Sequence, residues 1–343
     1  MEDPQGIGLG LSAALAWGLT DITASVLARR VGGLRATAWV QLVTLVVLVV
    51  LLVGTGTPLP SDPAIVLASL GWGVVSAVAY VSFFTALRHG PLTVVSPTVS
   101  VYGGLSVVLA VLLLGETLRP VQALGTAVAV GGVLLVSVVV DRAAGRVRVV
   151  GPGVLYALVA LVAFGAVTVG LSPVIGAAGW LPVLVLTRIA NTSSAWAMLG
   201  VRRYLRGRAA SSLAGADPEP AAEHAHVVVA APLGEVADPD DHGPGAHLDG
   251  SAAPPASARA ASRRIVRSTI AVGLVAGVLD VTGFAAFAVG LEVAPTWLIG
   301  LTSSFGPVVA VAAGVLLFGE RPRPVQWAGL ALVLGSVALI GLG

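Results

Sequence analysis

The chain consists mainly of long apolar runs separated by short connectors. A helix needs about 20 mostly apolar residues to cross a bilayer, and ten runs approach that length. Their residues are 6–28, 36–54, 64–87, 91–114, 120–140, 151–172, 180–200, 268–290, 295–317 and 322–342. None of them alternates polar with apolar residues, and lipid permits only helices or closed barrels. The pattern therefore predicts an all-α membrane protein with ten transmembrane helices.

One connector, at about residues 202–267, differs from all the others. It is rich in Ala, Pro, Asp, Glu, His and Arg and has almost no aromatic residues. Such a segment buries too little apolar surface to offset the entropy of ordering, so we interpret it as a disordered hydrophilic loop. Its histidines and aspartates match no closed metal site, and we expect no bound metal.

The chain repeats itself at an offset of 204 residues. Residues 112–125 read LLLGETLRPVQALG, and residues 316–329 read LLFGERPRPVQWAG. A weaker match at an offset of 147 places Ala16-Trp17-Gly18 over Ala163-Phe164-Gly165. The two offsets differ because the long connector is inserted into the second half.

Without that connector, each half has five helices. A duplicated unit with an odd number of helices enters the membrane from opposite sides in its two copies. We therefore predict two inverted five-helix repeats, residues 1–145 and 146–343. Transporters of this architecture bind substrate between the repeats, near the middle of the bilayer.

The chain resembles members of the drug/metabolite transporter superfamily, in particular its EamA-type ten-helix branch, at several motifs. They are the Trp17-Gly18 pair, Pro91 at the start of the fourth helix, and the Gly-Glu-x-x-x-Pro-x-Gln pattern at Gly115–Gln122 and Gly319–Gln326. The resemblance covers almost the whole chain except residues 202–267. It implies a carrier of a small metabolite or drug, often an exporter, and does not identify the substrate.

The composition agrees with a membrane protein. Charged residues make up 10% of the chain, against about 25% in soluble domains. The net charge is only +2, and all of the basic residues that contribute to it are arginines. Apolar runs separate these arginines along the chain, so we expect no nucleic-acid binding. The absence of Cys excludes disulfides and thiolate metal sites. We expect an integral, multi-pass protein of a bacterial-type plasma membrane.

Arginines gather on one side of the predicted bundle. The connectors after helices 1, 3, 5, 7 and 9 contain nearly all of them, and the opposite side contains Arg119. The positive-inside rule then predicts that both termini lie outside. The family resemblance implies the opposite, and we give precedence to the charge bias because it is a property of this sequence.

Three ionisable residues fall deep inside predicted helices, namely Asp21, Arg188 and Asp280. Such residues are costly in lipid and are candidates for function. Arg188 and Asp280 each lie about twelve residues, or ~18 Å, from the Arg-rich ends of their helices, so we predict that they pair near mid-depth. Asn191 lies one turn beyond Arg188 and could share its face.

Two interpretations of this pair remain open. In the functional one, Arg188 receives an anionic substrate group and Asp280 takes up a proton or a cationic group, since a carboxylate in a low dielectric is more easily protonated. In the structural one, a permanent ion pair joins the two helices. Asp21, one turn after Trp17, could attract cations or hydrogen-bond a neighbouring helix.

Other residues carry weaker predictions. Trp17, Tyr80, Tyr102 and Trp297 could stack a planar substrate or anchor helix ends at the membrane interface. Pro97 and Pro307 should kink their helices, either as gating hinges or as plain packing kinks. Glu116 and Glu320, which recur in both halves, fit a shared turn-capping role.

Enzymatic motifs are missing from the sequence. It contains no P-loop, H-E-x-x-H or Gly-x-Ser-x-Gly pattern, so we expect a non-enzymatic protein without cofactors. The leading hypothesis is a secondary transporter of a small molecule, driven by a proton or substrate gradient. The alternatives are a membrane subunit that recruits a cytoplasmic partner through residues 202–267, and a membrane enzyme or lipid-handling protein.

Overall fold

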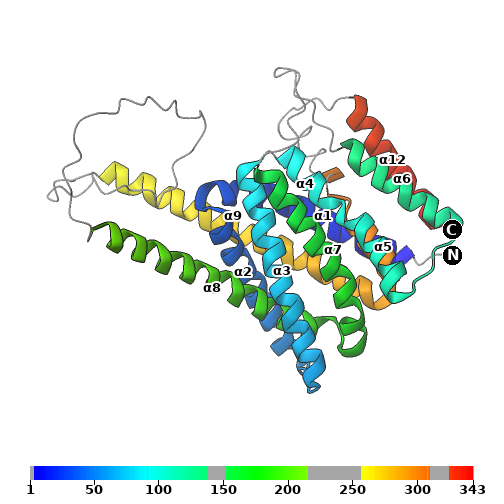
Figure 1. The fold of residues 1–343 in the computed structure, drawn as a ribbon, viewed down its shortest axis with the longest axis horizontal. Coiled ribbons are helices and arrows are strands. Elements are labelled where there is room, and N and C mark those ends of the chain that lie inside the picture. Colours follow the sequence, from blue (N-terminus) through cyan, green and yellow to red (C-terminus); the bar gives the residue numbers. More distant parts are fainter. Residues whose placement is uncertain are drawn as a thin grey trace.

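The computed structural model describes residues 4–90, 92–136, 152–214, 256–306, 308–309 and 324–342. Within these ranges the regular elements are α-helices, and no strand occurs (Figure 1). They are α1 (Pro4–Val31), α2 (Gly33–Thr55), α3 (Pro63–His89), α4 (Leu92–Ser100), α5 (Tyr102–Leu114), α6 (Pro120–Val136), α7 (Pro152–Ala178), α8 (Trp180–Ala214), α9 (Ala256–Val293), α10 (Thr296–Ser303) and α12 (Pro324–Leu342).

The outside of the bundle is apolar, as a membrane-embedded surface must be. Val53 and Leu112 are 74% and 73% exposed, which a soluble protein would avoid over so many positions. Five of the described helices are long and apolar enough by themselves to cross a membrane: α1, α2, α3, α7 and α9. Polar side chains such as Gln41 and Thr44 are instead fully buried between helices.

The helix packing shows that the two halves are related by a pseudo-twofold axis. The first helix of each half packs against the third helix of the other half: α1 against α9, and α7 against α3. The two second helices, α2 and α8, pack against each other, and so do the two last helices, α6 and α12. In Figure 1, α6 and α12 lie side by side near the two termini.

Close contacts of single residues follow the same axis. A Cβ on Gly18 would meet Val309, and a Cβ on Gly165 would meet Leu105. Gly18 and Gly165 are equivalent at the offset of 147, and Leu105 and Val309 are equivalent at the offset of 204. These matched contacts confirm the predicted pair of inverted repeats, while the predicted bounds, 1–145 and 146–343, stay a prediction.

Within the described residues, a helix is interrupted at an equivalent position of each half. The predicted helix 91–114 is divided at Val101 into α4 and α5. In the second half, α10 ends in a turn at Ser304–Phe305. Phe305 is equivalent to Val101 at the offset of 204. The kink predicted at Pro97, four residues before Val101, stays a prediction, and Pro307 lies outside the described residues.

The helices next to the long connector extend further than predicted. α8 continues to Ala214 and α9 begins at Ala256, so the ends of the predicted loop at 202–267 are helical. The sequence prediction was wrong there because it used apolarity, whereas residues such as Ala and Arg favour a helix in water as well. Residues 215–255 lie outside the described part, and their disorder stays a prediction.

The repeated Gly-Glu motif of the first half forms a turn that contacts the other half. Gly115 ends α5 with φ 68°, a left-handed conformation that favours glycine. The Glu116 carboxylate then accepts hydrogen bonds from the backbone N–H groups of Thr296 and Trp297, at 3.0 and 2.9 Å. This confirms the capping role predicted for Glu116, while Glu320 lies outside the described residues.

Glu116→Ala should therefore destabilise the bundle, because the first turn of α10 loses its cap. Loss of a helix cap typically costs about 0.5–2 kcal/mol. The measurement is the thermal unfolding midpoint of the purified protein, followed by tryptophan fluorescence. Glu116→Gln keeps one acceptor oxygen and is expected to lose less, so equal melting of all three proteins would contradict the cap.

Candidate transport site

A cavity lies between the two halves, beside both helix discontinuities. Its volume is about 80 Å³, and since an ordered water needs about 10–15 Å³, it has room for several waters. Its wall is strongly aromatic. The aromatic lining residues are Trp17, Tyr80, Phe83, Phe84, Tyr102, Phe164, Phe284 and Phe287.

The aromatic wall is built twice, once on each side of the pseudo-twofold axis. Trp17 packs on Phe284 and Phe287 with ring centroids 5.5 and 5.4 Å apart. Its repeat equivalent Phe164 packs on Tyr80 and Phe83 at 5.2 and 6.2 Å. The axis therefore passes through the cavity, which places the cavity where inverted-repeat transporters bind substrate.

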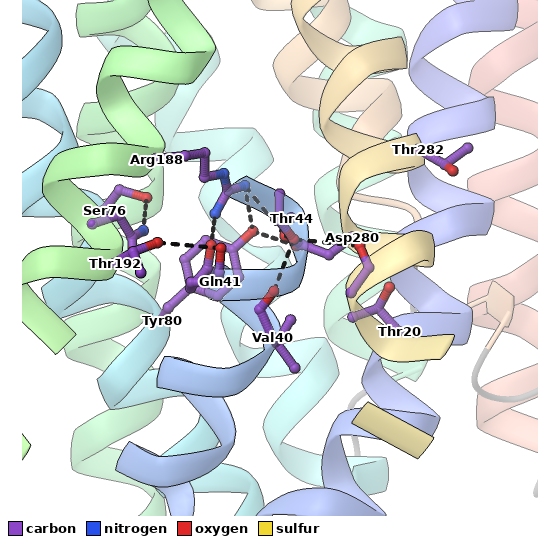
Figure 2. Close-up of polar contacts among 12 residues, drawn as sticks. Thr20, Val40, Gln41, Thr44, Ser76, Tyr80, Arg188, Thr192, Asp280 and Thr282 are labelled. Atoms are coloured by element: carbon purple, nitrogen blue, oxygen red, sulfur yellow. Dashed lines mark hydrogen bonds and ion pairs between the residues drawn. The ribbon is translucent and has the colours of Figure 1, made fainter. Parts of the chain in front are cut away.

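Arg188 and Asp280 form an ion pair deep in the bundle, as predicted (Figure 2). Arg188 Nη2 lies 3.4 Å from Asp280 Oδ2, and both side chains are at most 1% exposed. The Tyr80 hydroxyl donates to Asp280 Oδ1 at 2.7 Å, and the Thr44 hydroxyl donates to Oδ2 at 2.9 Å. Both oxygens of this carboxylate are thus engaged.

The guanidinium of Arg188 is held on several sides. Its Nη1 donates to the side-chain oxygen of Gln41, and its Nη2 donates to Tyr80 Oη at 3.3 Å. The Phe284 ring centroid lies 3.9 Å from the central carbon of the guanidinium, within cation–π range. This packing offsets part of the cost of a buried charge.

The residues of this network occupy equivalent positions in the two repeats. The two charged residues have neutral polar residues as their equivalents. Gln41 is equivalent to Arg188 at the offset of 147, and Ser76 is equivalent to Asp280 at the offset of 204. Asn191 donates to Ser76 Oγ at 2.9 Å, which mirrors the bond from Thr44 to Asp280. The first half thus has neutral polar residues at the two positions where the second half has the charged residues Arg188 and Asp280.

Asp21 lies on the cavity wall, apart from this network. Ser96 in α4 donates to its Oδ2, and Asp21 is buried, with 8% of the residue exposed. Its repeat equivalent is Thr168, which also lines the cavity. Of the ionisable groups that line the cavity, Asp21 and Asp280 are the carboxylates, and no Arg or His is among the described lining residues.

The sequence as a whole was compared with known proteins. The EamA-like transporter family matches residues 4–138 and 253–342, which is more than half of the chain. The chain belongs to the EamA-like transporter family. This confirms the resemblance drawn from the Gly-Glu motifs and the Trp17-Gly18 pair, together with the predicted helical membrane fold. No curated protein matches the chain.

Solved structures support the same fold for this EamA-like transporter. Matches are found to 29 chains. One of them, described as "Crystal structure of protein", has a TM-score of 0.63 at 18% identity and covers 98% of this chain and 96% of its own. At this identity the similarity shows the fold alone. The protein is an integral membrane transporter of the drug/metabolite type.

The structure brings together four of the six pathway residues predicted for the EamA-like transporter. Trp17, Asp21, Tyr80 and Asp280 all line the cavity. Arg188 does not, because the Phe284 ring covers its guanidinium. Asn191 faces Ser76 of α3 instead of the cavity.

The aromatic predictions divide in the same way. Tyr102 lines the cavity beside Trp17 and Tyr80. Trp297 does not, because its ring is buried in a separate apolar cluster with Leu298 and Phe305.

Sequence reasoning missed several residues of the site. Gln41 and Thr44 contact the ion pair directly, and Ser96 contacts Asp21. The sequence pattern could have indicated Gln41 and Thr44, because they are polar residues in a very apolar helix. They are three residues apart and therefore lie on one face of it. The phenylalanines of the cavity carry no such signal, since an apolar ring in a membrane helix is equally suited to face lipid.

Proposed function

We propose that the chain is a secondary active exporter that moves a small molecule by alternating access around the cavity, with a proton as the coupling ion. The observation that supports this most is the pair of helix discontinuities at Val101 and Ser304–Phe305. Discontinuous helices at equivalent positions of two inverted repeats mark the substrate site in many transporters.

The two halves touch at this point through short helix segments. A Cβ on Gly103 of α5 would lie 2.9 Å from the carbonyl oxygen of Gly300 in α10. The Tyr102 hydroxyl lies 3.1 Å from Ser303 Oγ, across the same contact. Small residues at this contact let the backbones of α5 and α10 approach each other closely, so a change in the contact would move both segments beside the cavity.

In this proposal the ion pair has a positioning role and Asp280 is the candidate for proton uptake. Arg188 fixes the Asp280 carboxylate at the cavity wall and is itself covered by Phe284. The sequence contains no nucleotide-binding motif, which favours a gradient as the energy source.

Alternating access can be tested with a single cysteine, because the chain has none of its own. Ser100 lines the cavity, so Ser100→Cys in liposomes should react with a membrane-impermeant thiol reagent from one side only. An imposed pH gradient should move that reactivity to the other side. Leu59→Cys, in an exposed connector, is the control and should react from one fixed side throughout.

Two results would contradict the proposal. Reactivity of Ser100→Cys from both sides at once would indicate an open channel, and reactivity from one side under every gradient would indicate a protein that does not alternate.

A further inference from the structure

The charges at the cavity do not cancel. The Asp280 carboxylate is neutralised by Arg188 at 3.4 Å. The Asp21 carboxylate has Ser96 as its hydrogen-bond partner and no cationic partner among the described residues. The cavity wall therefore carries one uncompensated negative charge when both aspartates are ionised.

This charge faces an aromatic enclosure. Trp17 lies one turn before Asp21 on α1 and lines the same cavity, and Tyr102, Phe164 and Phe287 complete the wall around it. Aromatic faces attract cations, most strongly when water is excluded. A carboxylate in a cavity lined by aromatic rings is suited to a positively charged group with an apolar surface.

The repeat offers a comparison for Asp21. Thr168 occupies the equivalent place in the other half, lines the same cavity, and bonds the carbonyl of Phe164 within its own helix at 2.9 Å. A hydroxyl thus satisfies this position in one half, while the other half holds a buried carboxylate. The cost of burying that carboxylate is explained if it meets a cation during the cycle.

We propose that Asp21 and the aromatic wall form a binding site for organic monocations, namely alkylammonium and quaternary ammonium groups. The inference rests on the proposed transport function and names the substrate class of the same cavity. Asp21 supplies the countercharge, and the rings of Trp17 and Phe287 contact the alkyl groups around the nitrogen.

Equilibrium binding of choline to the purified protein tests the site. Choline and 3,3-dimethylbutan-1-ol have the same shape and differ in charge, because carbon replaces the nitrogen. Unlabelled choline should displace bound radiolabelled choline at concentrations about tenfold or more below those of the alcohol, because the attraction between opposite charges in a partly buried site is worth at least that much. Absence of choline binding, or equal displacement by both compounds, overturns the proposal.

A matched pair of variants locates the charge. Asp21→Asn removes the countercharge and should weaken choline binding by about tenfold or more. Asp62→Asn makes the same change at an exposed helix cap, where asparagine also caps well, and should bind like the wild type. Equal binding by both variants overturns the role of Asp21. If Asp21→Asn fails to fold, the proposal is tested on the wild-type protein by the comparison of choline with 3,3-dimethylbutan-1-ol.

Choline counterflow into liposomes separates this inference from the proposed function. Charge-dependent binding without counterflow would leave the cation site standing and contradict the carrier. If the thiol of Ser100→Cys becomes reactive from alternate sides of the membrane but choline does not bind, the carrier is supported and the cation site is overturned.

Discussion

Asp280→Asn is expected to abolish transport while the protein still inserts and folds. The Asp280 carboxylate joins Arg188, Tyr80 and Thr44 on three other helices, and asparagine cannot neutralise the guanidinium. Flux into liposomes should fall to the level of protein-free vesicles. Normal transport by this variant would refute a role for the carboxylate in the cycle.

The same variant should also be less stable. Removing one partner of a buried ion pair leaves an uncompensated charge and costs about 3–5 kcal/mol. A folded yet destabilised protein is therefore expected, and size-exclusion and thermal unfolding measurements should accompany the flux assay.

A double variant separates a functional ion pair from a merely structural one. Arg188→Met together with Asp280→Leu replaces the pair by apolar side chains of similar size, a change that is often neutral or stabilising by about 1–4 kcal/mol. We expect stability to return and transport to remain absent. Recovery of transport together with stability would show that the pair serves only to hold α8 and α9 together.

Gly103→Leu is expected to stop transport through a steric effect. A Cβ at this position would lie 2.9 Å from the backbone oxygen of Gly300 and 2.5 Å from Cβ of Ser304. A backbone oxygen cannot rotate away as a side chain can, so α5 and α10 must separate. Overpacking of this kind costs about 1–3 kcal/mol, and the displaced segments lie beside the cavity.

The matched control for this substitution is Gly131→Leu. Gly131 lies in α6, and no described atom comes within 4 Å of a Cβ placed there. Its flux and melting temperature should stay close to those of the wild type. If Gly103→Leu also behaves like the wild type, the contact between α5 and α10 is not tight during transport.

Features of the fold that depend on length and composition were predictable from sequence. Apolar runs of about 20 residues located the spans, and the two offsets revealed the repeat. Depth was predictable too, because ~1.5 Å per residue brought Arg188 and Asp280 to the same level, and they pair at 3.4 Å. The break at Val101 was not predicted: Ser100 and the Gly103-Gly104 pair flank it, but the kink in this helix was expected at Pro97.

The direction in which a buried side chain points was not predictable in the same way. Depth along a helix follows from counting residues, whereas rotation about its axis depends on which neighbours pack against it. Arg188 therefore had the right depth and partner but is covered by Phe284. Asn191 likewise turned out to hold α8 to Ser76 of α3.

The lengths of α8 and α9 have a practical consequence. With 35 and 38 residues, these helices measure ~52 and ~57 Å, well beyond a hydrocarbon core of ~30 Å, and in Figure 1 they run out past the rest of the bundle. Val201 and Val266 lie on them and are exposed. Two spin labels on cysteines introduced there would report the separation of α8 and α9, the helices that carry Arg188 and Asp280, without touching the cavity.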